Sequence, residues 1–113
     1  MNEEARVSLW EAFSGLFLDT EITDAHFCHV ALAIEQSDIS LAEAEAVLWN
    51  EVFPVLHRNL QSVAGEWVGW PREWLVANLR AAVGPAQRTG PQSAVHEIQR
   101  CWEQVLGHLG SHA

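Results

Sequence analysis

Apolar residues recur every three or four positions along most of this chain, and the strict alternation that is typical of half-buried strands is missing. The first apolar segment follows Asn2, which we expect to cap a helix with Glu3 and Glu4 in its first turn. The apolar residues of this segment fall on one broad face: Val7, Leu9, Trp10, Phe13, Leu16 and Phe17. This spacing predicts a helix of about four turns that packs against two neighbours.

A second helix is predicted after a polar turn at residues 19–23, with Thr23 or Asp24 as its cap. Its apolar residues follow the i, i+3, i+4, i+7 pattern: Phe27, Val30, Ala31 and Ile34. The pattern stops near residues 36–38, where Gln, Ser and Asp follow one another. We therefore expect the second helix to end there.

A third helix is predicted to begin at Ser40. Ser40 and Glu43 are spaced as a capping box, in which the two side chains satisfy free backbone N–H groups at a helix start. Val47 and Trp49 lie off its main apolar stripe, so this helix is either central in the fold or carries a second apolar face. Pro54 has no N–H, so we expect the helix to kink or restart there before it runs on to about residue 62. The main stripe consists of Leu41, Ala44, Leu48, Val52 and Val55.

A fourth helix follows a loop that two Gly and one Pro predict at residues 64–71. Pro71 fits the first turn of this helix, which we expect to run from residue 72 to about residue 83. The apolar residues expected to face inward are Leu75, Leu79 and Ala82.

A linker at residues 84–90 leads to Pro91, which opens the last helix. This helix has the most regular apolar stripe: Val95, Ile98, Trp102, Val105, Leu106 and Leu109. The tail from residue 110 is expected to fray. Together the segments predict an all-α fold, a compact bundle of about five helices with the third helix kinked at Pro54. The length of 113 residues predicts one domain, residues 1–113.

Charge is distributed very unevenly along the chain. Residues 1–51 carry eleven Asp or Glu against one basic residue, Arg6, whereas residues 52–113 carry four acids and five arginines. The first part has a net charge of −10 and the second of +1, which together give −9. Such a balance disfavours nucleic acid and anionic membrane as partners and favours a basic protein surface.

The sequence also bears on compartment and redox state. The acidic start of the chain differs from a secretory signal, and no apolar run approaches the ~20 residues of a membrane span, so we expect a cytoplasmic protein. Cys28 and Cys101 lack the spacing of a zinc or redox motif, and we expect two reduced, buried thiols.

The sequence contains the first residues of some catalytic motifs, but none of these motifs is complete. His96 and Glu97 start like a zinc-protease motif, but the fifth position is Arg100 where a second His is needed. Ser14 lacks the preceding Gly of a nucleophile elbow, and no Gly-rich loop followed by Lys can hold a phosphate. We therefore expect no enzyme, no catalytic residue and no cofactor.

Metal sites are similarly incomplete. His26 and His29 share one helix face, but Cys28 points elsewhere and no third ligand is evident, so ordinary helix positions are the favoured interpretation. Asp19, Glu21 and Asp24 resemble half of a calcium loop without its central Gly and closing Glu, which favours an acidic turn. We expect no bound metal.

Part of the acidic surplus is explained by helix starts, because anions in first turns interact favourably with the helix dipole. The rest forms either a solvated face or a binding face, and two loop tryptophans, Trp67 and Trp70, either close the core or anchor a partner. Trp74 is assigned to the core. Glu43 and Glu51 flank Val47 on the third helix, as a mixed acidic and apolar stripe. The candidate partner-binding residues are Asp19, Glu21, Asp38, Glu43, Glu45, Val47, Glu51, Trp67 and Trp70.

Several strings carry a resemblance to a known family: residues 16–21 (LFLDTE), 51–54 (EVFP), 59–60 (NL) and 63–69 (VAGEWVG). With them the chain resembles a family of small uncharacterised bacterial proteins, a domain of unknown function, over roughly residues 7–76. The Ala-Gly-Glu-Trp string is the most specific part, and residues from 84 onward lie outside the match. The resemblance implies a small bacterial protein, some of whose kind look like immunity partners of antibacterial toxins, and it transfers no functional residue.

These observations favour a protein that binds and blocks a basic toxin domain, with the acidic part steering the encounter and exposed apolar side chains anchoring the complex. The alternative is a small self-associating or adaptor protein whose third helix makes a symmetric homodimer. A metal-dependent enzyme built on His26 and His29 is the least favoured hypothesis.

Overall fold

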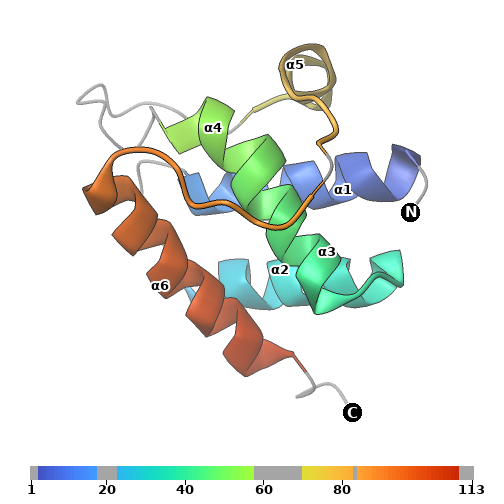
Figure 1. Ribbon diagram of the computed structural model, residues 1–113. Helices are drawn as coiled ribbons and strands as arrows, with labels where there is room; N and C mark the ends of the chain where they lie inside the picture. Colours follow the sequence, from blue (N-terminus) through green and yellow to red (C-terminus); the bar gives the residue numbers. More distant parts are fainter. Residues whose placement is uncertain (1–2, 18–22, 58–69, 83, 110–113) are drawn as a thin grey trace.

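The amphipathic segments form helices in the computed structural model, which describes residues 3–17, 23–57, 70–82 and 84–109 (Figure 1). These described residues contain no strand, and they form five helices when three consecutive helical segments are counted as one. The prediction of an all-α bundle of about five helices is confirmed. The elements are α1 (Glu3–Ser14) with its extension η1 (Gly15–Phe17), α2 (Asp24–Ser37), α3 (Leu41–Ala46), η2 (Val47–Val52), α4 (Phe53–Leu56), α5 (Arg72–Asn78) and α6 (Gln92–His108).

The three consecutive segments α3, η2 and α4, which we call the rod, run through the middle of the fold (Figure 1). The helix α1 contacts α2, the η2 part of the rod and α5, and α6 packs on α2 and η1. The radius of gyration is 13.0 Å, close to the ~13 Å of a compact chain of this length. The central position of the rod explains why its sequence is apolar around most of its girth.

The core is built from large aromatic side chains of α1, η1 and the rod. The largest fully buried side chains are Trp49, Phe13, Phe17 and Phe53. Phe53 lies beside Trp49 with ring centroids 5.0 Å apart, and its ring meets Phe17 edge-on at 6.1 Å. Edge-on and offset aromatic pairs of this kind contribute beyond their buried area, so this cluster fixes the rod against α1.

Helix caps follow the sequence closely. Thr23 is the N-cap of α2, and its backbone N–H donates to Nδ1 of His26 at 3.2 Å. Ser40 caps α3 by accepting the backbone N–H of Glu43 at 3.1 Å. Between these helices Asp38 adopts the left-handed conformation, with φ of 56°, that ends α2.

The rod changes its hydrogen-bonding pattern just before Pro54. Residues Val47–Val52 form a π-helix, in which the N–H of Phe53 donates to the carbonyl of Leu48 five residues earlier. Because Pro54 has no N–H to offer the preceding turn, a wider turn is one way to reorganise the bonds. The expected restart therefore occurs as a switch from α to π and back, while a bend of the axis stays a prediction.

The fourth and last helices depart from expectation in two places. The helix α5 ends at Asn78, about five residues earlier than predicted, because Leu79 turns to an extended backbone with φ of −97° and ψ of 152°. Leu75 and Leu79 are buried as expected, but Ala82 is exposed. On α6, Leu106 is 38% exposed although it continues the predicted apolar stripe.

The expectations for Asn2, residues 19–22, 58–69 and the tail from 110 lie outside the described residues. Among the residues that are described, no helix combines the length and the apolar composition needed to cross a bilayer.

Candidate functional site

The predicted stripe on the third helix is not a surface. Val47 is 2% exposed and Glu51 is 3% exposed, so neither residue can contact a partner in the folded chain. The prediction was wrong because the rod is central: α1 covers the η2 stretch on which both residues lie. Helical spacing placed the two side chains near each other correctly, but it does not distinguish a covered face from an open one.

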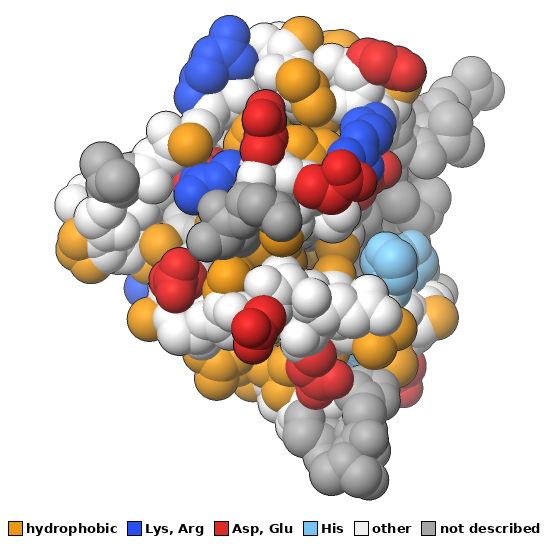
Figure 2. Space-filling view, turned by 90° about the vertical axis from the view of Figure 1, so that its right-hand side faces the viewer, with side chains coloured by type: hydrophobic (Ala, Val, Ile, Leu, Met, Phe, Trp, Pro, Cys, Tyr) orange, Lys and Arg blue, Asp and Glu red, His pale blue; other side chains and the backbone are white. Residues whose placement is uncertain are grey.

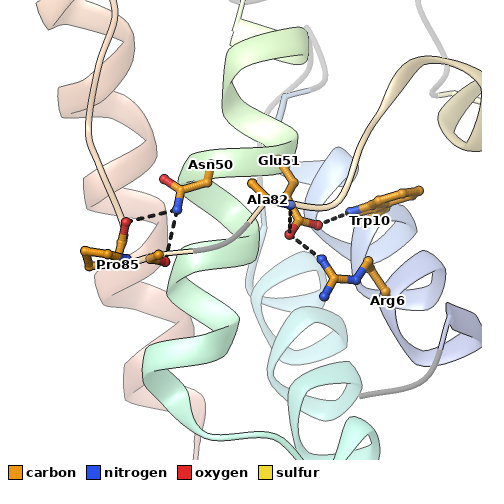
Figure 3. Close-up of polar contacts among 7 residues, drawn as sticks. Arg6, Trp10, Asn50, Glu51, Ala82 and Pro85 are labelled. Atoms are coloured by element: carbon orange, nitrogen blue, oxygen red, sulfur yellow. Dashed lines mark hydrogen bonds and ion pairs between the residues drawn. The ribbon is translucent and has the colours of Figure 1, made fainter.

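Glu51 instead holds together three parts of the molecule (Figure 3). Its carboxylate accepts a hydrogen bond from Nε1 of Trp10 at 2.9 Å and pairs with the guanidinium of Arg6, both on α1. The backbone N–H of Ala82, beyond α5, donates to the same carboxylate at 3.0 Å. A buried charge is tolerated when it is paired and hydrogen-bonded in this way, so Glu51 has a structural role.

Folding also neutralises other acids of the first half. Arg72 on α5 reaches back to α1, where its guanidinium lies 2.6 Å from Glu11 and 3.4 Å from Glu4. Arg88 pairs with Glu45 on α3, one of the predicted partner-binding residues. The charge asymmetry counted along the sequence is therefore smaller on the surface of α1 and along the rod.

Within the described residues, the junction of α2 and α3 keeps an excess of negative charge. Where α2 ends and α3 begins, Glu35, Asp38 and Glu43 are all exposed. Among the described residues, Asp38 and Glu43 form no ion pair with an arginine, since each described arginine bonds elsewhere. Figure 2 shows acidic side chains over both the upper and the lower part of this face, while most of the basic ones lie in the upper part, among acids.

Two exposed leucines stand within three residues of these carboxylates in the chain. Leu32 on α2 is 42% exposed and Leu41 at the start of α3 is 48% exposed, and both are among the large apolar residues most open to solvent. We call the set of Leu32, Glu35, Asp38, Leu41 and Glu43 the acidic corner. Exposed leucine together with exposed carboxylates is a combination that suits a partner with apolar and basic side chains.

Sequence reasoning identified Asp38 and Glu43 of this corner and missed its two leucines. Leu41 was assigned to the inward stripe of the third helix, and Leu32 lies off the i, i+3, i+4, i+7 pattern of α2. A signal did exist for Leu32, because an apolar residue opposite the buried stripe of an amphipathic helix has to face outward.

Trp70 and Trp74 differ less in burial than the sequence predicted. Trp70 and Trp74 are half-buried, have ring centroids 6.3 Å apart and pack against the core. Trp74 thus fits its core assignment in part. The predicted residues Asp19, Glu21 and Trp67 lie outside the described residues.

The chemistry available to the described side chains is limited. In the described part of the chain, no three His, Cys, Asp or Glu side chains are grouped so as to hold a metal ion. Cys28 and Cys101 are both reduced thiols, and Cys28 is only half-buried, which corrects the prediction of two buried thiols. Burial raises the pKa of Cys101 to about 11, so this thiol stays protonated and weakly nucleophilic at neutral pH.

Comparisons with known proteins give one match. No curated protein and no solved structure matches the chain. A family model described as "Domain of unknown function (DUF7079)" matches residues 4–106. The match extends past the residues 7–76 on which the resemblance was based and takes in most of the last third. Because it covers nearly the whole length, the chain belongs to this family of unknown function, DUF7079.

Proposed function

We propose that this chain is a non-enzymatic binding protein that takes a basic protein partner at the acidic corner. In this proposal it is a cytoplasmic immunity or antitoxin protein that neutralises a basic toxin domain by stoichiometric binding. The observation that supports the proposal is the coincidence of three exposed carboxylates with two exposed leucines at the junction of α2 and α3.

The physical argument has two parts. Exposed carboxylates attract a basic surface over distances of the Debye length and raise the association rate. Once the partner has docked, Leu32 and Leu41 lose solvent-exposed apolar area, which slows dissociation. The corner thereby replaces the buried pair Val47 and Glu51 as the surface on which the partner is expected.

The alternative of a symmetric homodimer is weakened by the fold. Its proposed contact was the third helix, and Val47 is buried there. A two-fold contact through the acidic corner would bring like charges of two copies together, which costs free energy. A basic heterologous partner therefore suits the surface better than a second copy does.

The test compares two variants of equal net charge. Glu35→Gln, Asp38→Asn and Glu43→Gln together neutralise the corner and keep side-chain size, and Asn still tolerates the left-handed conformation at position 38. The control, Glu73→Gln with Glu97→Gln and Glu103→Gln, removes two exposed charges and one half-buried charge on α5 and α6. The partner is first captured from the source organism at low ionic strength and then purified for kinetics.

The corner variant is expected to associate about tenfold more slowly than wild type at low salt, and its rate should depend less on salt. The control variant should keep a near wild-type rate. Equal losses in both variants would show that net charge acts without a defined site, and no loss in either would reject the proposal.

A further inference from the structure

The connection between α5 and α6 crosses the rod as an extended segment, seen in front of the rod in Figure 1. We call residues 79–82 and 84–90 the strap. Its two ends are fixed by packing, since Leu79 is 1% exposed and Gly90 passes so close to Phe53 that a Cβ would lie 3.0 Å from the ring. Its middle is held mainly by hydrogen bonds and an ion pair from side chains of the rod. Such polar contacts can be exchanged for those of another donor or acceptor more easily than packing can.

Asn50 binds the strap as a neighbouring strand would, and Figure 3 shows its bond to Pro85. Its Nδ2 donates to the carbonyl of Pro85 at 3.0 Å, and its Oδ1 accepts the backbone N–H of Gln87 at 2.9 Å. Pairing with a C=O and with the N–H two residues later is how one parallel strand bonds another. Such contacts recognise an extended backbone whatever its side chains are.

A second element of recognition lies one step further along the strap. The guanidinium of Arg88 lies 4.9 Å from the ring centroid of Trp49 and pairs with Glu45, while its Nε donates to Gln99 at 2.8 Å. An aromatic face, a carboxylate and an amide oxygen together form a site for an arginine side chain. Asn50 and this arginine site together read a backbone carbonyl followed three residues later by an arginine, a spacing that residues 85–88 supply as Pro-x-x-Arg.

The fit of the strap over this cradle is incomplete. A cavity of about 260 Å³ opens between strap and rod beside Trp49, Asn50, Pro54, Pro85, Gln87 and Thr89. In the described part of the chain, Nε1 of Trp49 is buried without a hydrogen-bond partner. A buried donor left unpaired costs free energy, so the arrangement of strap and rod around Trp49 is not fully satisfied.

We propose that Glu45, Trp49 and Asn50 form a peptide-binding cradle, which the strap occupies as an internal ligand. An extended basic segment of a protein partner with Pro-x-x-Arg spacing displaces the strap and places its own arginine on Glu45 and Trp49. This inference rests on the proposed function only in assigning the displacing segment to the basic partner. Binding of a free peptide to the cradle does not depend on that function.

Competition with the strap makes the proposal measurable. The apparent affinity for an external peptide is the intrinsic affinity reduced by the fraction of molecules in which the strap is lifted. Arg88→Gln removes the internal arginine at an exposed position and leaves the cradle residues unchanged. The probe is the peptide acetyl-Gly-Pro-Ala-Gln-Arg-Thr-amide, and the control peptide carries Gln in place of Arg.

Isothermal titration calorimetry is expected to show the probe binding Arg88→Gln at least about tenfold more tightly than wild type, and more tightly than the control peptide. Adding Glu45→Gln to this variant should return the probe to the affinity of the control peptide, and thermal melts check that both variants are folded. Equal binding to wild type and Arg88→Gln, equal binding of both peptides, or no binding would overturn the proposal. Such a failure leaves the test of the acidic corner unaffected, since that test uses other residues.

Discussion

At the scale of single residues, Glu51 is the side chain on which most of the polar interior depends. Its carboxylate is shared by Arg6, Trp10 and the N–H of Ala82, so Glu51→Gln removes the charge and leaves at least one donor without an acceptor. We expect the free energy of unfolding to fall by about 3 kcal/mol, the lower end for breaking a buried pair, because Arg6 is partly exposed. Urea unfolding measures this change.

The control for Glu51 is Glu97→Gln, which breaks the exposed pair with Arg100 on α6. Exposed pairs contribute ~1 kcal/mol or less, so this variant should stay close to wild type. If both variants lost the same small amount of stability, the network around Glu51 would not contribute as the geometry indicates.

The burial of Glu51 also shows where sequence reasoning stops at this scale. The caps at Thr23 and Ser40 could be predicted because their partners lie three residues away. The partners of Glu51 lie 45, 41 and 31 residues away, so nothing local distinguishes it from an exposed acid. The acidic corner was half predicted for the same reason: its carboxylates could be recognised, but the exposure of its leucines depends on tertiary packing.

At the scale of elements, the π-helical stretch η2 determines which side chains reach the strap. Pro54 predicts a disturbance of the rod, but a kink and a wider turn both accommodate the missing N–H, so the sequence does not choose between them. The choice matters because it sets the directions of three consecutive residues. Trp49 enters the core, Asn50 binds the strap, and Glu51 faces Arg6 and Trp10.

Substituting Pro54 tests this dependence. Removing a proline from a helix interior can stabilise the helix by ~3 kcal/mol, because the N–H and the steric space are restored. We expect Pro54→Ala to raise the free energy of unfolding by much less than this, or to lower it, since an α-helical rod would turn Asn50 and Glu51 away from the strap. Urea unfolding gives the stability, and hydrogen exchange gives the protection of the N–H groups of Ala82 and Gln87.

Two results would contradict this view of η2. One is a gain in the free energy of unfolding close to the ~3 kcal/mol for an interior proline. The other is unchanged hydrogen-exchange protection of the N–H groups of Ala82 and Gln87 in Pro54→Ala. Ala86→Gly, a change in the strap that leaves the Asn50 and Glu51 side chains unaltered, serves as a control for general loosening of the connection.

At the scale of the whole molecule, folding redistributes the charge that the sequence separates. Counting residues predicted one acidic and one nearly neutral half, yet Arg72 and Arg88 from the second half pair with acids of the first. Helix patterns could predict the all-α class. They could not predict these long-range pairs, and therefore they could not show which acids of the first half are neutralised by an arginine.

The charge that remains should be visible in the stability of the free protein. With a net charge of −9 and the described arginines already bonded, added salt screens more repulsion than attraction. Raising NaCl from about 10 mM to about 150 mM shortens the Debye length from ~30 Å to ~8 Å. We expect the melting temperature at neutral pH to rise by about 2 to 5 °C.

The same measurement compares two variants of equal net charge. With added salt, the melting temperature of the variant with Glu35→Gln, Asp38→Asn and Glu43→Gln should rise less than that of the α5 and α6 control variant, because the mutual repulsion is concentrated at the corner. A melting temperature that falls with salt would mean that internal ion pairs outweigh this repulsion, and an equal rise in both variants would mean that the surplus is spread evenly over the surface.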